Sequence, residues 1–252
     1  MDSTAEAAGR WSRDHGHSLA WRRTRGRGPT VVWLGGFHSD MTGTKAQVLA
    51  EWGAQTGHDV LRFDYFGHGQ SSGTFADGTI SRWREDVLAI LDGLTEGPVV
   101  LVGSSMGGWL AVLAALARPA RVRGVVLVAP AADFTEALIK PALSAEALDA
   151  IADHGAWRRP SDYADGAYEI TRTLLEDGAR WCVLPGPVAV NVPVRVLQGG
   201  CDPDVPWPHA LALAEALVSE DVVFSLIRDG DHRLSRPQDL ARLVAAVSEL
   251  VG

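Results

Sequence analysis

Residues 99–107 read Val-Val-Leu-Val-Gly-Ser-Ser-Met-Gly, and a second apolar stretch follows at 108–116. This order predicts a buried strand, a sharp turn with Ser105 at its apex, and a helix. Gly103 and Gly107 stand two residues before and after Ser105, where side chains would collide with the adjacent strand and helix. The G-x-S-x-G pattern in this setting is typical of a nucleophile elbow, which presents a serine hydroxyl to a carbonyl group; the alternative is a glycine-rich turn without chemistry.

Apolar strand patterns alternate with helical periodicity through most of the chain. The predicted strands cover residues 30–34, 59–64, 99–102, 123–130, 193–198 and 222–227, and the predicted helices cover 44–55, 81–94, 108–116, 208–218 and a C-terminal segment that ends near 251. This alternation predicts an α/β fold with a mostly parallel central sheet and helices on both faces. Ligands of such sheets bind at the carboxyl ends of the strands, where Ser105 is expected to lie.

Residues 133–192 interrupt this alternation. The segment is rich in alanine, is divided by prolines, and shows no convincing strand pattern. A helical insert of this length between two sheet strands predicts a cap over the site, with an ordinary helical crossover as the alternative. We therefore expect a hydrolase-like core of residues 1–132 and 193–252 and a helical cap of residues 133–192.

The composition limits the classes of partner. With a net charge of −8 the chain has no basic excess to neutralise phosphates, so nucleic acid is not an expected partner. The basic stretch 22–27 predicts a solvated hairpin turn, with a nucleic-acid or anionic-lipid patch as the alternative. Two cysteines do not suggest a disulfide framework, no apolar stretch approaches the roughly 18 residues of a membrane span, and the N-terminus lacks a signal-peptide core. These features predict a cytoplasmic location.

A serine hydroxyl is a weak nucleophile unless a base takes its proton and a third group orients the base. Asp202 and His232 each follow a predicted strand, in the chain order Ser, Asp, His that suits a nucleophile elbow. We expect Ser105 as nucleophile, Asp202 as acid and His232 as base. Asp204 competes for the acid role and could otherwise cap the following helix, while Asp202 could be a turn-forming residue.

The tetrahedral intermediate of acyl transfer also needs hydrogen-bond donors for its oxyanion. The backbone N–H of Met106 lies at a predicted helix N-terminus, and the loop Gly35-Gly36-Phe37-His38 follows an early strand. We assign the donors to the N–H groups of Met106 and Phe37. The side chains of Phe37 and His38 are expected to shape the pocket, with a catalytic role for His38 as the alternative. No His, Cys or Asp spacing fits a metal ligand set, so neither a metal nor a cofactor is expected.

The elbow, the late aspartate and the final histidine together resemble the α/β-hydrolase superfamily. Residues 64–72 also resemble the D-x-x-G-x-G-x-S loop of that superfamily. A closer resemblance, over roughly residues 30 to 250, is to the family of the mitochondrial palmitoyl-protein thioesterase, also described as mycophenolic acid acyl-glucuronide esterase. The strings that carry it are residues 39–46, 62–65, 103–109 and 205–207, with 155–157, 160–163 and 190–193 in the cap.

This resemblance implies the α/β-hydrolase fold, the residues Ser105, Asp202 and His232 as catalytic triad, and hydrolysis of acyl thioesters or activated esters. We expect no transit peptide, and the alanine-, arginine- and glycine-rich composition is typical of a GC-rich bacterium. We therefore expect a bacterial relative, whose substrate need not be that of the mitochondrial enzymes because fold does not fix function.

The sequence thus predicts a serine hydrolase of carboxylic esters or acyl thioesters, acting on a small molecule or on an acylated protein. The alternatives are a ligand receptor without catalysis on the same fold, or an enzyme of acyl transfer, lactone hydrolysis or carbon–carbon bond hydrolysis. No pattern indicates an oligomeric state. Four cap aromatics are candidates for an apolar acyl pocket, with ordinary packing between cap and core as the alternative: Trp157, Tyr163, Tyr168 and Trp181.

Overall fold

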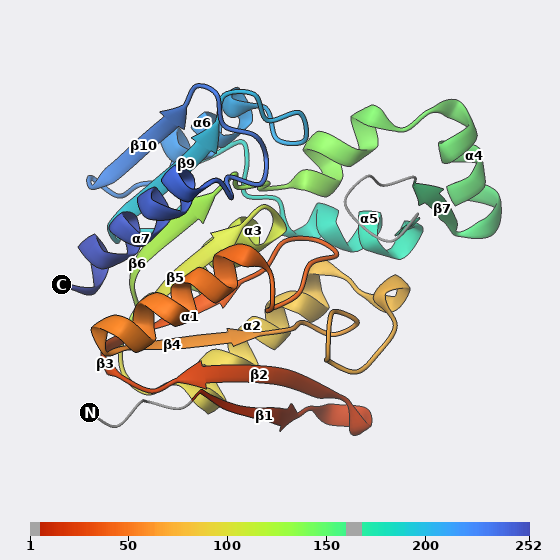
Figure 1. The fold of residues 1–252 in the computed structure, drawn as a ribbon. Helices are drawn as coiled ribbons and strands as arrows, with labels where there is room; N and C mark the ends of the chain where they lie inside the picture. Colours follow the sequence, from red (N-terminus) through yellow and green to blue (C-terminus); the bar gives the residue numbers. More distant parts are fainter. Residues whose placement is uncertain (1–5, 160–167) are drawn as a thin grey trace.

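An eight-stranded sheet forms the centre of the molecule, in a computed structural model that describes residues 6–159 and 168–252 (Figure 1). Its strand order is β1-β2-β4-β3-β5-β6-β9-β10. The strands are β1 (Ala7–Ser12), β2 (Ser18–Thr24), β3 (Arg27–Leu34), β4 (His58–Phe63), β5 (Val99–Ser104), β6 (Val122–Val128), β9 (Val194–Gly199) and β10 (Val222–Ile227). All neighbours from β4 to β10 pair in parallel, which confirms the predicted fold class.

Helices cover both faces of this sheet. One face carries α1 (Thr44–Thr56) and α7 (Pro237–Val251), and the other carries α2 (Ile80–Leu94), α3 (Met106–Ala117) and α6 (Trp207–Ala216) (Figure 1). Side chains of a strand point alternately to the two faces. In β5, Val100 and Val102 pack in the core beneath α1 and α7, whereas Val99 and Leu101 pack in the core beneath α2 and α3. A strand buried on both sides is apolar at every position, which is why its sequence is a continuous apolar run.

The N-terminal edge of the sheet differs from the sequence-based expectation. Strands β1 and β2 form an antiparallel pair, and β2 pairs antiparallel with β4, not with β3. The predicted hairpin over residues 22–27 is therefore wrong, whereas residues 25–27 are exposed as predicted. Arg23 is buried, and its Nε donates to Asp59 Oδ1 at 2.8 Å. This arginine is satisfied by a buried carboxylate, so its place in a basic stretch did not signal exposure.

The segment between β6 and β9 contains helices and two short strands. It includes α4 (Ala145–His154), α5 (Arg172–Gly178), and the antiparallel strands β7 (Ala156–Arg159) and β8 (Tyr168–Thr171). The expectation that this segment has no strand is wrong, because four-residue strands are too short to leave a periodic pattern. In Figure 1, α4 and β7 extend away from the sheet, while α5 lies closer to it.

Helix α5 is attached to α2 by a polar contact. The carboxylate of Asp177 accepts hydrogen bonds from the backbone N–H and the hydroxyl of Ser81, at 2.7 and 2.6 Å. Both contacts bind the first turn of α2, where N–H groups lack partners within the helix. This part of the segment is therefore fixed to the core beside the carboxyl ends of the strands.

Candidate active site

Ser105 occupies the sharp turn between β5 and α3. Its backbone angles, φ 55° and ψ −120°, lie outside the regions that non-glycine residues ordinarily adopt. The turn is held because the Ser105 N–H donates to the carbonyl of Val128 at 2.9 Å, and its carbonyl accepts from the N–H of Ala131 at 3.1 Å. The strand-turn-helix arrangement with a strained serine at its apex is the predicted elbow.

The glycines of the elbow are required by close backbone contacts. A Cβ added to Gly103 would lie 2.2 Å from the carbonyl oxygen of Gly107, and one added to Gly107 would lie 2.1 Å from that of Leu34. Both distances are far below van der Waals contact. A Cβ on Gly36 would lie 3.3 Å from the Cβ of Ser105. The loop after β3 therefore packs directly against the serine.

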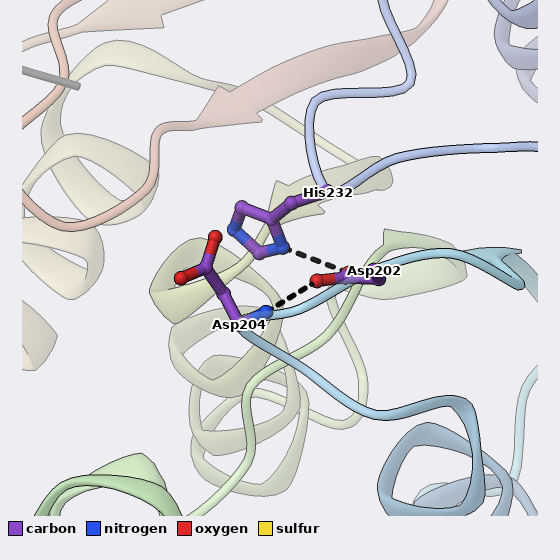
Figure 2. A group of neighbouring side chains, drawn as sticks. All are labelled: Asp202, Asp204 and His232. Carbon is purple, nitrogen blue, oxygen red and sulfur yellow. Dashed lines mark hydrogen bonds and ion pairs between the residues drawn. The ribbon is translucent and has the colours of Figure 1, made fainter. Parts of the chain in front are cut away.

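His232 and Asp202 form a hydrogen-bonded pair at the ends of the neighbouring strands β10 and β9 (Figure 2). The His232 Nδ1–H donates to Asp202 Oδ2 at 2.8 Å, and Gln198 Nε2 donates to the same oxygen at 3.2 Å. The other oxygen, Oδ1, accepts the N–H groups of Asp204 and Val205, each at 2.9 Å. With its side chain fully buried, Asp202 thus accepts hydrogen bonds at both oxygens. This fixes both its position and the imidazole that it holds.

Asp204 lies beside the same imidazole. Figure 2 shows its carboxylate on the side of the ring away from Asp202. It does not cap the next helix, because α6 has Pro206 as N-cap and no side chain bonds to its first turn. Ligand atoms of Asp202, Asp204 and His232 lie within 4.8 Å of one another, a group that could hold a metal ion and that sequence spacing did not predict. Two of these three residues are already bonded to each other.

A cavity of ≈ 660 Å³ opens at the carboxyl ends of the strands. It is lined by Ser105, Met106, His232, Phe37 and His38, which come from loops after three different strands. The structure thus brings the predicted nucleophile, the predicted base and the loop of Phe37 to one place. Asp202 lies behind His232 and is buried.

The cavity has apolar and polar walls. Apolar residues from the segment after β6 supply one part of the lining: Ala131, Phe134, Leu138, Ile139 and Ala142. The loop after β3, the start of α1 and the loop of His232 supply a polar part: Ser39, Asp40, Thr42, Thr44, Lys45, Arg233 and Ser235. One side of the cavity can hold hydrocarbon, and another can hold a polar group.

The aromatic side chains predicted for an acyl pocket divide between this cavity and the core. Tyr168 lines the cavity, and its ring centroid lies 5.4 Å from that of Phe37. Trp157 and Trp181 are not among the lining residues; both pack against the hydrophobic core, and Trp181 Nε1 donates to a hydroxyl of α2 at 2.8 Å. These two side chains therefore pack between the segment after β6 and the core, which is the alternative given for them in the sequence. Tyr163 lies outside the described residues.

Sequence analysis gave no role to Lys45. Its Nζ donates to the carbonyl of Arg233, directly after His232. Burial lowers the pKa of Lys45 to about 8; Asp231 acts in the opposite direction, and Arg233 lowers it further. The ammonium group therefore holds the loop that carries the imidazole. The available signal was its position within residues 39–46, one of the strings that carried the family resemblance.

Comparisons with known proteins agree with this geometry. Residues 28–168 match the family described as serine aminopeptidase, S33. The mitochondrial palmitoyl-protein thioesterase ABHD10 of Mus musculus is 39% identical over 235 residues, which cover 93% of this chain and 79% of that protein. The Homo sapiens protein of the same name is 37% identical over 93% of this chain and 76% of its own length.

Two solved structures extend the likeness to the whole fold. Alpha/beta hydrolase domain-containing protein 10 from mouse superposes with a TM-score of 0.89 at 38% identity, covering 97% of this chain and 98% of that one. A protein from Agrobacterium vitis S4 superposes with a TM-score of 0.93 at 44% identity, covering 98% and 99%. Within the described residues, no helix is long and apolar enough to cross a membrane. The relatives' names place them in mitochondria, so a cytoplasmic location for this chain stays a prediction.

The family resemblance seen in the sequence is therefore confirmed, as is the fold that it implied. The serine turn, the strand order and the cavity at the carboxyl ends of the strands are arranged as in a hydrolase of this class. The chain belongs to the α/β-hydrolase family that includes the palmitoyl-protein thioesterase ABHD10.

Proposed function

We propose that this chain is a serine hydrolase of acyl thioesters and carboxylic esters, with Ser105 as nucleophile, His232 as general base and Asp202 as the acid that orients it. The observation that carries the proposal is the shared cavity: a strained serine turn and His232, which is bonded to Asp202 at 2.8 Å, both border it. The Nδ1–H of His232 is used by Asp202, which directs Nε2 to the proton of the serine hydroxyl.

In the first half of the reaction, Ser105 Oγ bonds to the acyl carbon while its proton passes to His232 Nε2. The C–S or C–O bond then breaks, and the imidazolium returns that proton to the leaving thiolate or alkoxide. In the second half, His232 takes a proton from water, and the resulting hydroxide attacks the acyl-enzyme. The carboxylic acid leaves and Ser105 regains its proton. No other reactant is needed for this balance.

The oxyanion of each tetrahedral intermediate would be bound by the N–H groups of Met106 and Phe37. Met106 is the first residue of α3, whose N-terminal amides carry partial positive charge. Phe37 lies in the loop that Gly36 brings against Ser105. Loss of one such donor reduces kcat by about 100- to 1000-fold in enzymes of this kind.

The substrate class follows from the walls of the cavity and from the relatives. Phe134, Leu138 and Ile139 offer an apolar surface for an acyl chain. The ring of Tyr168 packs against that of Phe37 in the same cavity. The named relatives are palmitoyl-protein thioesterases, which favours a long-chain acyl thioester, on a small molecule or on an acylated protein.

A fluorophosphonate probe and a substrate panel test the proposal. The probe should add to Ser105 in the wild type and not in Ser105→Ala, as measured by intact mass. Acyl thioesters and p-nitrophenyl esters from acetyl to palmitoyl should be hydrolysed by the wild type alone, with longer chains favoured. Leu138→Trp should narrow the cavity at its apolar wall and shift the substrate preference to short acyl chains. A wild type with neither adduct nor turnover would favour a ligand receptor on this fold.

A further inference from the structure

The loop after β4, residues 64–72, binds the loop that follows β3 at three points. We call residues 35–42 the oxyanion loop. At its start, the Tyr65 hydroxyl donates to the carbonyl of Gly35 at 3.2 Å. In its middle, the His38 N–H donates to Nε2 of His68 at 3.3 Å. At its end, the N–H of Met41 donates to Asp64 Oδ1 at 2.7 Å.

These three contacts are made by buried side chains. Asp64, Tyr65 and His68 are each at most 3% exposed. Hydrogen bonds in such places are difficult to replace by water, so their loss leaves an unpaired group. None of the three side chains lines the cavity, which distinguishes them from the residues that would touch substrate. Their contacts with the oxyanion loop therefore need a different explanation from substrate binding.

The protonation state of His68 follows from its two partners. Nδ1 lies 3.1 Å from the carbonyl oxygen of Phe66, which can only accept, so Nδ1 carries the proton. Nε2 faces the N–H of His38, which can only donate, so Nε2 has a free lone pair. Burial lowers the pKa of His68 to about 4, with the Phe66 hydrogen bond acting in the opposite direction. The ring is therefore neutral near pH 7 and serves as an acceptor.

His38 is the residue of the oxyanion loop that most needs support. Its φ is 59°, in the left-handed region that non-glycine residues adopt at some cost. It directly follows Phe37, whose N–H is the proposed oxyanion donor. An acceptor at the His38 N–H fixes the peptide plane between these two residues. A shift of this plane would move Phe37 relative to Ser105.

We propose that His68 is a positioning residue of the oxyanion hole: its Nε2 holds the His38 N–H and thereby keeps the Phe37 N–H aimed at the developing oxyanion. This inference rests on the proposed function, because it requires that Phe37 donate to the tetrahedral intermediate. The hydroxyl of Tyr65 binds the start of the same loop, at the carbonyl of Gly35. His68 does not itself touch substrate.

A purely structural role is the competing explanation, because the His68 ring also packs against aromatic rings. Its centroid lies 5.4 Å from that of Tyr65, 5.1 Å from Phe75 and 5.2 Å from Trp83. A test must therefore compare two variants that both lack the ring and its Nδ1–H, and of which only one keeps an acceptor near the position of Nε2. His68→Gln places an amide oxygen near the position of Nε2, and His68→Met places a methyl group there.

The experiment compares kcat and KM of the wild type, His68→Gln and His68→Met on one acyl thioester. A misaligned oxyanion donor weakens only transition-state binding, so His68→Met should lower kcat by about 10- to 100-fold without raising KM. His68→Gln should restore kcat to within about threefold of the wild type. The affinity for a boronic acid transition-state analogue should fall in His68→Met in parallel with kcat.

The inference is overturned if both variants keep wild-type kcat, or if both lose activity equally. If His68→Met does not fold, Tyr65→Phe provides the second test: it removes one hydroxyl and keeps the ring, and it should lower kcat at constant KM. An unchanged kcat in Tyr65→Phe would then count against the inference. Labelling of Ser105 by the fluorophosphonate is followed in parallel. A wild type that labels and turns over, beside variants that match it, refutes the positioning role and leaves the proposed function standing.

Discussion

Replacement of His68 by glutamine should change how the stability of the protein depends on pH. In the folded protein, burial lowers the pKa of His68 from its ordinary value of 6.5 to about 4. Between these two values the unfolded chain binds a proton that the folded chain does not. Protonation therefore favours the unfolded state, and stability falls as the pH drops through this range. Above the ordinary pKa both states are neutral, and His68 makes no pH-dependent contribution.

The magnitude follows from the two pKa values. The difference between a pKa of 6.5 in the unfolded chain and about 4 in the folded chain corresponds to a loss of about 3 kcal/mol in the free energy of unfolding at low pH. About 2 to 3 kcal/mol of this loss has occurred at about pH 4.5. At about pH 7.5 the same term is close to zero. The free energy of unfolding of the wild type, minus that of His68→Gln, should therefore fall by about 2 to 3 kcal/mol between these two pH values. Urea unfolding of both proteins at a series of pH values measures this difference.

The subtraction matters because another buried group titrates nearby in the opposite direction. Burial raises the pKa of Asp86 to about 7, against the lowering effects of the Phe66 N–H and of Arg13. Acidification therefore stabilises the fold through Asp86, in the wild type and in the variant alike. His68→Met, which also lacks the titrating ring, serves as the matched control and should follow His68→Gln. If the difference in the free energy of unfolding between wild type and variant does not change with pH, His68 is not buried and neutral in the folded protein. The proposed positioning role would then lose its basis.

Three further outcomes are expected. Asp202→Asn should lower kcat by about 10 000-fold, because the amide no longer fixes the imidazole tautomer, whereas Asp204→Asn should cost far less; the reverse order would show that Asp204 is the acid. Gly107→Ala should destabilise the fold by about 3 kcal/mol or more in urea unfolding, because its Cβ would lie 2.1 Å from the carbonyl oxygen of Leu34, while Gly43→Ala, with a nearest contact of 3.5 Å, should change little. Turnover should survive incubation with EDTA, and its loss would point to a bound cation in the reaction.

The parallel part of the sheet could be predicted because burial on both faces demands apolar residues at every position. The strand before Ser105 is such a run, and it lies at the centre of the sheet. The antiparallel strands β1 and β2 carry a weaker signal, since β1 alternates between exposed and half-buried positions. Strands β7 and β8 form an antiparallel pair of four residues each, which is too short to leave a periodic sequence pattern.

The candidate site shows a similar division. Chain order and strand ends sufficed to nominate Ser105, Asp202 and His232, because the carboxyl ends of parallel strands meet at one edge. Side-chain direction between β6 and β9 did not follow from sequence: Trp181 and Tyr168 are both aromatic residues of this segment, yet one binds α2 and the other lines the cavity. A histidine such as His68 has no local sequence pattern that separates an internal acceptor from a solvated side chain.

Backbone strain in the described residues is concentrated at this same edge. The described non-glycine residues with positive φ all lie in segments that follow the carboxyl ends of sheet strands: His15, His38, Ser105, Ala129, Asp133 and Leu234. Each such conformation costs on the order of 1–3 kcal/mol and persists only where surrounding contacts restrain it. For the oxyanion loop, part of that restraint comes from residues 64–72. This loop in turn needs glycine at position 69, where a Cβ would lie 2.3 Å from Asp64 Oδ2. The D-x-x-G-x-G-x-S pattern thus has a physical reason that involves no contact with substrate: its residues bind residues 35–42, the loop that carries the proposed oxyanion donor.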